Sequence, residues 1–284
     1  MFDNKKLKNW SKSYWNHINR NIGIITVGEQ EKLRKTSIAI LGVGGLGGPL
    51  VEQLVRTGCE NLLICDNGKF EVSNLNRQIC IRKDIGKYKV DVIKRLLKNI
   101  NPEMKLKTFK EININNISNI LNNISIVALT LDDPITSILI ARECYKNNIS
   151  MLESWAIPYL CGWWFTEKSV DYETFYGLKT HEKPIQEIID SKDLVFEIRK
   201  AFLNKLKQFP SIEEKFDREK GALNKLLSGR IPSISFAPIV RLSASYLAYE
   251  IVFTGVLKVK EMILAPNIIG YDYFNMEPLN FSLV

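Results

Sequence analysis

The sequence predicts an α/β fold of the Rossmann-like type, a doubly wound and mostly parallel sheet with helices on both faces. Two observations lead to this prediction. A short buried strand run at 37–41 is followed by a glycine-rich loop, a helical stretch from Pro49 and a second apolar strand at 62–65. Strands and helices then alternate up to residue 152 at the spacing of strand–helix–strand units, which favours parallel strands joined by covering helices.

The individual elements are predicted from hydrophobic periodicity and from helix and turn signals. A short helix at 28–35 precedes the first strand. After the second strand we expect helices at 86–99, 115–121 and 134–145, and strands at 104–109, 124–130 and 149–152. Further on we expect a helix with the apolar stripe Val195, Ile198, Phe202, Leu206 and Phe209, then helices at 211–227 and 235–253, and closing strands within 256–274.

These elements suggest one domain in four parts. They are a basic arm with a short helix at 1–36, a nucleotide-binding core at 37–166, an inserted helical element at 167–232 and a C-terminal helix with strands at 233–284. The stretch 171–232 is charge-balanced, with twelve basic and eleven acidic residues. We interpret this insert as a lid or a substrate-recognition element, with additional structural packing as the alternative.

The loop after the first strand carries the pattern G-x-G-x-x-G at Gly42, Gly44 and Gly47, with Gly45 between them. Residues without a Cβ let the backbone turn tightly and approach a phosphate closely, and the following helix directs free N–H groups at that anion. Asp66 ends the next strand, where a carboxylate can accept the hydroxyls of a ribose. Strand, loop, helix, strand and terminal Asp together predict a nucleotide site.

The net charge of +8 is concentrated near the N-terminus. Residues 1–36 contain eight Lys and Arg against three Asp and Glu, with Trp10, Tyr14 and Trp15 between them. A basic arm with aromatic side chains can bind RNA. We favour the alternative, an amphipathic segment that packs on another subunit; the abundance of Asn, Ile and Lys throughout the chain suggests an AT-rich genome, which weakens any argument from basicity.

Composition also bears on compartment and on metal chemistry. The five cysteines include no C-x-x-C pair, which favours reduced thiols in a cytoplasm over a disulfide or zinc framework. Only two histidines are present, so a histidine-based triad is not expected. We expect no signal peptide and no membrane partner, because residues 1–20 are polar and the apolar stretch 231–257 is interrupted by Arg241 and Glu250.

Several motifs around this site resemble those of the ThiF/MoeB family, the adenylating enzymes related to the ubiquitin-activating enzymes. The motifs are Arg20, the glycine loop, Asp66, Ser-Asn-Leu-Asn-Arg-Gln at 73–78, Gly-Lys-Tyr-Lys at 86–89 and Leu-Asp-Asp at 131–133. The resemblance implies an ATP-dependent adenylyltransferase in which a carboxylate attacks the α-phosphate to give an acyl adenylate and pyrophosphate. The implied substrate is the C-terminus of a peptide or of a small carrier protein.

The resemblance also implies roles for individual residues. Arg77 and Lys89 look like the cations that stabilise phosphate charge, and Asp132 looks like the Mg²⁺ ligand. Asn74 would hold the nucleotide, and Arg20 would reach the site of the other subunit in a homodimer. Each assignment has a structural alternative: Lys89 as a solvated lysine, Arg77 as a partner in a loop salt bridge, and Asp132 or Asp133 as the cap of the next helix.

Departures from the family pattern narrow the prediction. Gly68 stands where relatives commonly have a second acidic residue, and no C-x-x-C pairs are present, so no zinc is expected. No cysteine follows Thr166, in the region where many relatives carry a thiol that accepts the activated carrier. We therefore predict direct transfer of the acyl group to another nucleophile without an enzyme thioester, as in the cysteine-independent members that modify peptides.

Two other functions remain open at this stage. A nicotinamide-dependent oxidoreductase would use the same glycine loop, but it would give Arg77, Lys89 and Asp132 no task. A non-catalytic partner subunit of a heterodimeric activating enzyme would keep the fold while another chain carried the chemistry. Retention of all three polar residues argues against that second alternative.

Overall fold

The computed structural model describes residues 9–283; the first eight residues of the predicted basic arm and Val284 lie outside the described part. Six strands form the central sheet in the order β3-β2-β1-β4-β5-β7, and only β7 runs antiparallel to its neighbour. These strands are β1 (Ser37–Leu41), β2 (Asn61–Cys65), β3 (Lys105–Phe109), β4 (Ile126–Leu129), β5 (Ser150–Glu153) and β7 (Trp163–Phe165). The predicted doubly wound, mostly parallel sheet is confirmed.

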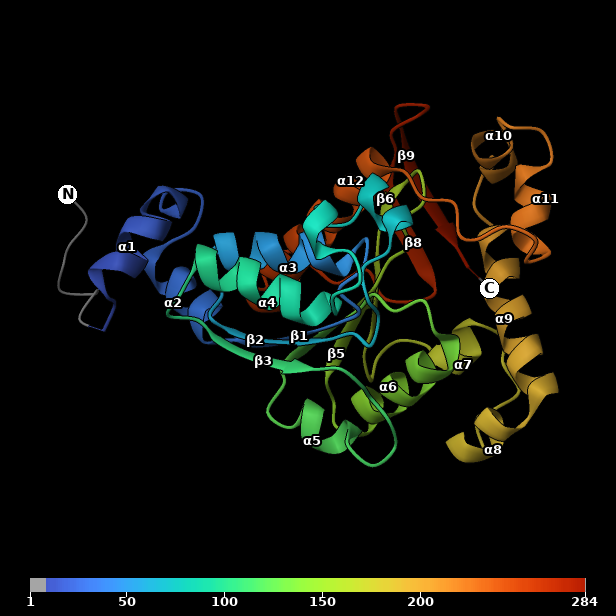
Figure 1. The fold of residues 1–284 in the computed structure, drawn as a ribbon, viewed down its shortest axis with the longest axis horizontal. Helices are drawn as coiled ribbons and strands as arrows, with labels where there is room; N and C mark the ends of the chain where they lie inside the picture. The colour runs from blue at the N-terminus through green and yellow to red at the C-terminus, as the bar shows by residue number, and fades with distance from the viewer. Residues whose placement is uncertain (1–8, 284) are drawn as a thin grey trace.

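Helices cover both faces of this sheet (Figure 1). Alternate side chains of a strand point to opposite faces, so Ile38 and Ile40 of β1 join one core cluster and Ala39 and Leu41 join the other. The first face is covered by α3 (Gly47–Arg56), α4 (Lys89–Ile100) and α12 (Ala237–Tyr249). The second face is covered by α5 (Ile117–Leu121), α6 (Pro134–Lys146) and the insert.

The N-terminal segment packs on its own chain. It comprises α1 (Lys12–Ile18), the 3₁₀ turn η2 (Asn19–Asn21) and α2 (Val27–Lys35). The buried Tyr14 hydroxyl donates to the Gly58 carbonyl oxygen at 2.8 Å and accepts from Gln30 at 3.0 Å. Tyr14 is therefore used within its own chain, and packing of this amphipathic segment on another subunit stays a prediction.

The insert is an integral part of the second face and not a separate body. Its helices are α7 (Tyr172–Phe175), α8 (Ile185–Asp190), α9 (Lys192–Leu206), α10 (Ile212–Phe216) and α11 (Ala222–Leu227), and their apolar side chains belong to the same cluster as those of α6. Arg142 of α6 forms a bidentate pair with Glu173. The buried Lys215 of α10 pairs with Asp272 of β8 (Asn267–Asp272).

Two sequence predictions in this half of the chain need correction. The single helix expected at 211–227 is broken into α10 and α11, because Gly221 takes a left-handed φ of +81° and Asp217 accepts from the Leu223 N–H. Of the closing strands expected within 256–274, β8 lies in that range, but its antiparallel partner β9 (Glu277–Ser282) lies beyond it; β8 also pairs with the short β6 (Leu160–Cys161). Together they form a second, three-stranded sheet.

The apolar C-terminal helix is buried, as predicted. Residues Ala237–Val256 comprise α12 and the π-helical turn η5 (Glu250–Val256), and by length and composition alone they could cross a membrane. In the structure 61% of the apolar window is buried, with α12 packed along α3. Glu250 is enclosed, accepting from Trp164 Nε1 and from Lys260. This helix therefore covers the sheet.

Candidate active site

The glycine loop is held against the end of β4 by contacts that only glycine permits. Gly42 has a φ of +97°, and a Cβ on it would lie 2.5 Å from the Thr130 carbonyl oxygen. A Cβ on Gly47 would lie 1.8 Å from the Gly42 carbonyl oxygen. Thr130 Oγ1 donates to that same oxygen at 2.6 Å. The helix α3 then starts without a side-chain cap: Gly48 and Leu50 donate to the Gly44 and Leu46 carbonyl oxygens, and the positive end of the helix dipole lies at this loop.

Asp66 fixes the other side of the loop. It is buried at the end of β2; Oδ2 accepts from the Val43 N–H at 2.9 Å and Oδ1 from the Gly68 N–H at 2.7 Å. The carboxylate therefore orients the loop backbone before any ligand is present. Its remaining lone pairs are the ones that could accept ribose hydroxyls.

Two cations lie over the loop. A Cβ on Gly44 would be 3.9 Å from Lys89 Nζ, and a Cβ on Gly45 would be 3.6 Å from Arg77 Nε. Arg77 Nη1 donates to Ser73 and Asn76 oxygens at 3.2 and 2.8 Å. Within residues 9–283, neither cation takes part in a salt bridge, so the alternative of Arg77 as a partner in a loop salt bridge is wrong.

The two neighbouring aspartates after β4 have separate roles. Asp133 is the N-cap of α6, accepting from the N–H groups of Ile135 and Thr136 at 3.3 Å each. Pro134 occupies the first helical position, as is common next to such a cap. Asp132 is thereby left without a capping role, and its side chain is solvent-exposed.

The pKa of Asp132 is shifted by burial and by the charged residues of the site. Protein atoms crowd the carboxyl although water reaches it, and this partial desolvation raises its pKa. Lys89 and Arg77 lower that pKa, and Asp66 raises it. The structure therefore brings Arg77, Lys89, Asp66 and Asp132 close enough to interact around the glycine loop, at the carboxyl edge of the parallel strands.

Three further polar or small residues in this part of the chain are Asn74, Gln78 and Gly68. Asn74 is buried in the 3₁₀ turn η3 (Val72–Asn76), where its Oδ1 accepts from the Glu71 N–H at 3.1 Å. Gln78 was not singled out, yet it is buried beside Gly44 and its Oε1 has no partner among the described residues. The position of Gln78 at the end of the Ser-Asn-Leu-Asn-Arg-Gln motif is the sequence signal that could have indicated it.

The glycine at position 68 is explained by lack of space, because a Cβ on it would lie 3.1 Å from Lys89 Nζ.

Arg20 is not brought to this site within one chain. It lies in η2, where the neighbouring Asn21 donates to the Thr57 carbonyl oxygen at 3.1 Å. Thr57 follows the last turn of α3, whereas the glycine loop precedes the first turn. Ten residues of helix, about 15 Å, separate the two ends. Figure 1 shows α1, next to η2, at the far end of the molecule from the insert.

A buried carboxyl at the end of β5 is a second feature that the sequence did not reveal. Glu153 accepts from Trp163 Nε1 at 3.1 Å and from the hydroxyls of Tyr172 and Tyr176 at 3.2 and 2.8 Å. Burial raises its pKa from 4.5 to about 7, although these three donors act in the opposite direction. Glu153 links β5 to β7 and to α7, and so fixes the insert beside the site edge.

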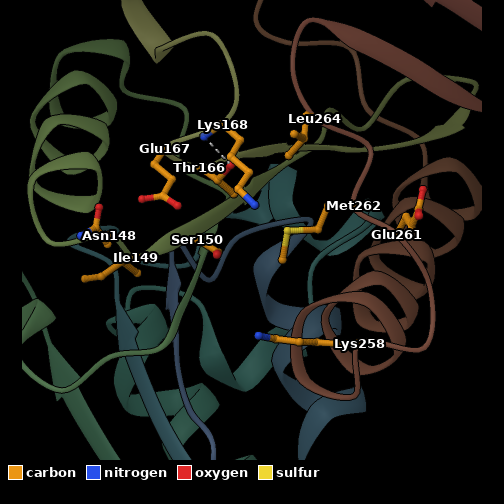
Figure 2. Close-up of a pocket in the computed structure, with 10 residues that line it drawn as sticks. All are labelled: Asn148, Ile149, Ser150, Thr166, Glu167, Lys168, Lys258, Glu261, Met262 and Leu264. Atoms are coloured by element: carbon orange, nitrogen blue, oxygen red, sulfur yellow. Dashed lines mark hydrogen bonds between the residues drawn. The ribbon is translucent and has the colours of Figure 1, made fainter.

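A cleft of about 610 Å³ lies elsewhere (Figure 2). Glu167 and Lys168 form part of one wall and Lys258 and Met262 part of another. Ser150 in its lining is the first residue of β5, so the cleft lies at the amino edge of the parallel strands. The polar groups around the glycine loop occupy the opposite edge, and this cleft is not their binding site.

Comparison with protein families and curated proteins gives matches to this chain. The ThiF family model matches residues 18–283. Ubiquitin-like modifier-activating enzyme 5 of Drosophila willistoni is 31% identical over 121 residues, 43% of this chain and 30% of that protein. A probable molybdopterin-synthase adenylyltransferase of Gracilaria tenuistipitata var. liui is 32% identical over 133 residues, 45% of this chain and 38% of that protein. The matches thus span about a third of these curated relatives.

A solved structure is similar over more of the chain. The structure of E. coli MccB with ATP matches with a TM-score of 0.62 and 21% identity, covering 90% of this chain and 66% of that one. At this identity the likeness shows a shared fold. The same fold has been solved as the microcin C7 biosynthetic enzyme MccB in complex with N-formylated MccA.

The raised pKa of Glu153 predicts a pH-dependent stability. Because its folded-state pKa lies above the unfolded value, the contribution of Glu153 to stability is greatest below pH 4.5 and is lost as pH rises through about 7. The difference corresponds to about 3 kcal/mol in the free energy of unfolding. We expect Glu153→Gln to be less pH-sensitive, so its melting temperature should gain on wild type between pH 5 and pH 8.

The matched control is Glu197→Gln on the exposed surface of α9, where the side chain is 64% exposed. Its melting temperature should follow that of wild type at every pH. A constant difference between Glu153→Gln and wild type across the same range would contradict the assigned pKa.

Proposed function

The chain belongs to the ThiF family, and on that premise we propose that it is an ATP-dependent adenylyltransferase that activates a carboxylate as an acyl adenylate. The observation that supports this most is the gathering of Arg77, Lys89 and Asp132 around the glycine loop, with both cations outside any described salt bridge. Hydride transfer would give these three residues no task, and a non-catalytic subunit would have no need of them.

The proposed reaction requires charge stabilisation and no strong base. A carboxylate oxygen of the substrate forms a bond to the α-phosphorus of ATP, the bond from that phosphorus to the bridging oxygen breaks, and pyrophosphate leaves with the electron pair. The attacking group is already ionised at neutral pH, so no proton has to be removed. Lys89 and Arg77 would hold the phosphate oxygens, and the positive end of the α3 dipole would favour their negative charge.

Magnesium would be held by Asp132 together with the phosphates. Mg²⁺ is commonly bound by one or two carboxylates plus substrate oxygens, and it neutralises phosphate charge. In the described part of the chain no group of three or more His, Cys, Asp or Glu could hold a metal alone. The donor set fits an ion that the protein holds through a single carboxylate, and Asp132 is solvent-exposed and not used as a helix cap.

The substrate we propose is the C-terminus of a peptide or small carrier protein. We propose a cytoplasmic location for the reaction. MccB, which shares the fold, has been solved with the peptide MccA, and the name of the activating-enzyme relative refers to a ubiquitin-like modifier. Both kinds of substrate would present a terminal carboxylate. The acyl adenylate would then pass directly to another nucleophile, because the thiols of this chain are poorly suited to a relay.

The state of the cysteines supports this second step. Four of the five thiols are buried, and burial raises the pKa of Cys59, Cys65 and Cys161 to about 12 and that of Cys144 above its usual range. Cys80 is half-buried, and burial raises its pKa as well. A relay needs a thiolate that the substrate can reach. None of the five offers one near neutral pH.

The test of adenylation is pyrophosphate exchange into ATP with Mg²⁺, measured against a library of peptides with free C-termini. We expect Asp132→Asn to lower exchange about a hundredfold or more, because a group that stabilises charge in the transition state is lost. Asp133→Asn is the matched control: asparagine is also a good N-cap, so exchange should stay near wild type. The proposal fails if ATP with Mg²⁺ does not raise the melting temperature of the wild type.

The test of the direct transfer is chemical. We expect Cys80→Ser to retain steady-state turnover of an active peptide within about twofold, because the proposed mechanism gives the thiol no role after the adenylate has formed. Intact-mass spectra of wild type, quenched in acid during turnover with an active peptide, should show unmodified protein. A substrate adduct that hydroxylamine or a thiol removes would overturn the proposal of transfer without an enzyme thioester.

We further propose a homodimer in which Arg20 acts in the site of the other subunit, since within one chain it lies at the opposite end of α3. Arg20→Ala and Asp132→Asn should each be inactive alone. After mixing and exchange of subunits, about a quarter of wild-type activity should return, because each mixed dimer contains one site with both groups. No recovery in mixed dimers, verified by differently tagged chains, would assign Arg20 to its own chain or to no catalytic task.

A further inference from the structure

The end of β5 lies next to the proposed reaction centre. In the parallel pairing of β4 with β5, Leu129 lies opposite Glu153, so Leu131 and Trp155, each two residues beyond its strand, both follow the carboxyl ends of neighbouring strands. Asp132 follows Leu131 directly. Trp155 is therefore one strand beyond the carboxylate that we assign to the metal.

The order of strands along this edge indicates where ATP and the acyl substrate would lie relative to each other. We propose that the nucleotide is held by Asp66, the glycine loop and Asp132. They lie at the carboxyl ends of β2, β1 and β4, three strands that are consecutive in the sheet. The ribose end of the nucleotide would lie at β2 and the reacting phosphate near β4. The next strand in that direction is β5. An acyl group bonded to the α-phosphate would then extend toward the end of β5.

The Trp155 ring is held in place by aromatic neighbours from β7 and the insert. Its centroid lies 5.6 Å from that of Trp163 in an edge-to-face arrangement, 6.2 Å from that of Tyr176 and 5.8 Å from that of Phe209. Trp163 and Tyr176 in turn donate hydrogen bonds to the buried carboxyl group of Glu153. Trp155 is only half-buried, so part of the residue remains exposed to solvent.

We infer that Trp155 forms the wall of the acyl subsite and selects a carboxylate whose neighbouring side chain is apolar or aromatic. This inference rests on the proposed adenylation. The charged group nearest in the sheet, Glu153, is enclosed by its three donors and offers no pairing to a charged substrate side chain. An apolar side chain gains contact area on the indole face, whereas a charged one loses hydration there without a partner.

The test uses stable analogues of the acyl adenylate, so it does not depend on knowing the natural substrate. Dissociation constants are measured for adenosine 5′-sulfamate and for its N-acetylglycyl, N-acetylphenylalanyl and N-acetylaspartyl derivatives. In the wild type we expect the phenylalanyl compound to bind about tenfold or more tightly than the glycyl and aspartyl compounds. In Trp155→Ala this advantage should disappear, and in Trp155→Phe most of it should remain.

Two controls separate the subsite from the rest of the fold. Adenosine 5′-sulfamate should bind wild type and Trp155→Ala equally, and Tyr145→Ala should bind all four compounds like wild type, because Tyr145 is 59% exposed in the last turn of α6, at the other edge. If Trp155→Ala does not fold, Trp155→Leu replaces it, since a smaller aliphatic side chain also removes the aromatic face.

Each outcome decides the matter. Equal affinities of the three acyl compounds for the wild type, or a phenylalanyl preference that survives in Trp155→Ala, would overturn the role of Trp155 while leaving the nucleotide site intact. Failure of adenosine 5′-sulfamate itself to bind the wild type would overturn the proposed function and this inference with it. The two failures are told apart by that one compound.

Discussion

The close approach of the glycine loop to the ends of β2 and β4 is the constraint on which the rest of the site depends. Asp66 accepts from the Val43 N–H and Thr130 donates to the Gly42 carbonyl oxygen, so the loop is bonded to the strands on both sides. The contacts are so close that a Cβ at Gly42 or Gly47 would overlap backbone atoms. Because the fold fixes this backbone, Lys89 and Arg77 lie at defined positions relative to the glycine loop.

Much of this arrangement could be predicted from the sequence because it is local. The β1 strand, the glycine loop and α3 are contiguous in the chain, and hydrophobic periodicity with glycine spacing specifies them. The family motif then indicated Arg77, Lys89 and Asp132, which the structure does bring together. The division of labour between Asp132 and Asp133 could not be predicted, since either can cap a helix that begins at Pro134; only the backbone geometry assigns the cap to Asp133.

What the sequence could not show arises from contacts between distant segments. Gln78 is buried against Gly44, and Glu153 is enclosed by Trp163, Tyr172 and Tyr176, which come from a strand and a helix later in the chain. The break between α10 and α11 depends on a left-handed Gly221, a conformation that helix propensity alone does not reveal. These features depend on tertiary packing, which overrides local preference.

The carboxyl groups of Asp132 and Glu153 lie at the ends of the neighbouring strands β4 and β5, at the carboxyl edge of the sheet, but their environments suit different tasks. Desolvation raises the pKa of both Asp132 and Glu153, but the surroundings differ. Lys89 and Arg77 act on Asp132, which water still reaches, so it can remain ionised and take a cation. Glu153 has only neutral donors in contact and is buried, so its carboxyl oxygens are occupied by the hydrogen bonds of Trp163 and the two tyrosines. The end of β4 is therefore suited to phosphate chemistry, and the end of β5 to a rigid apolar wall.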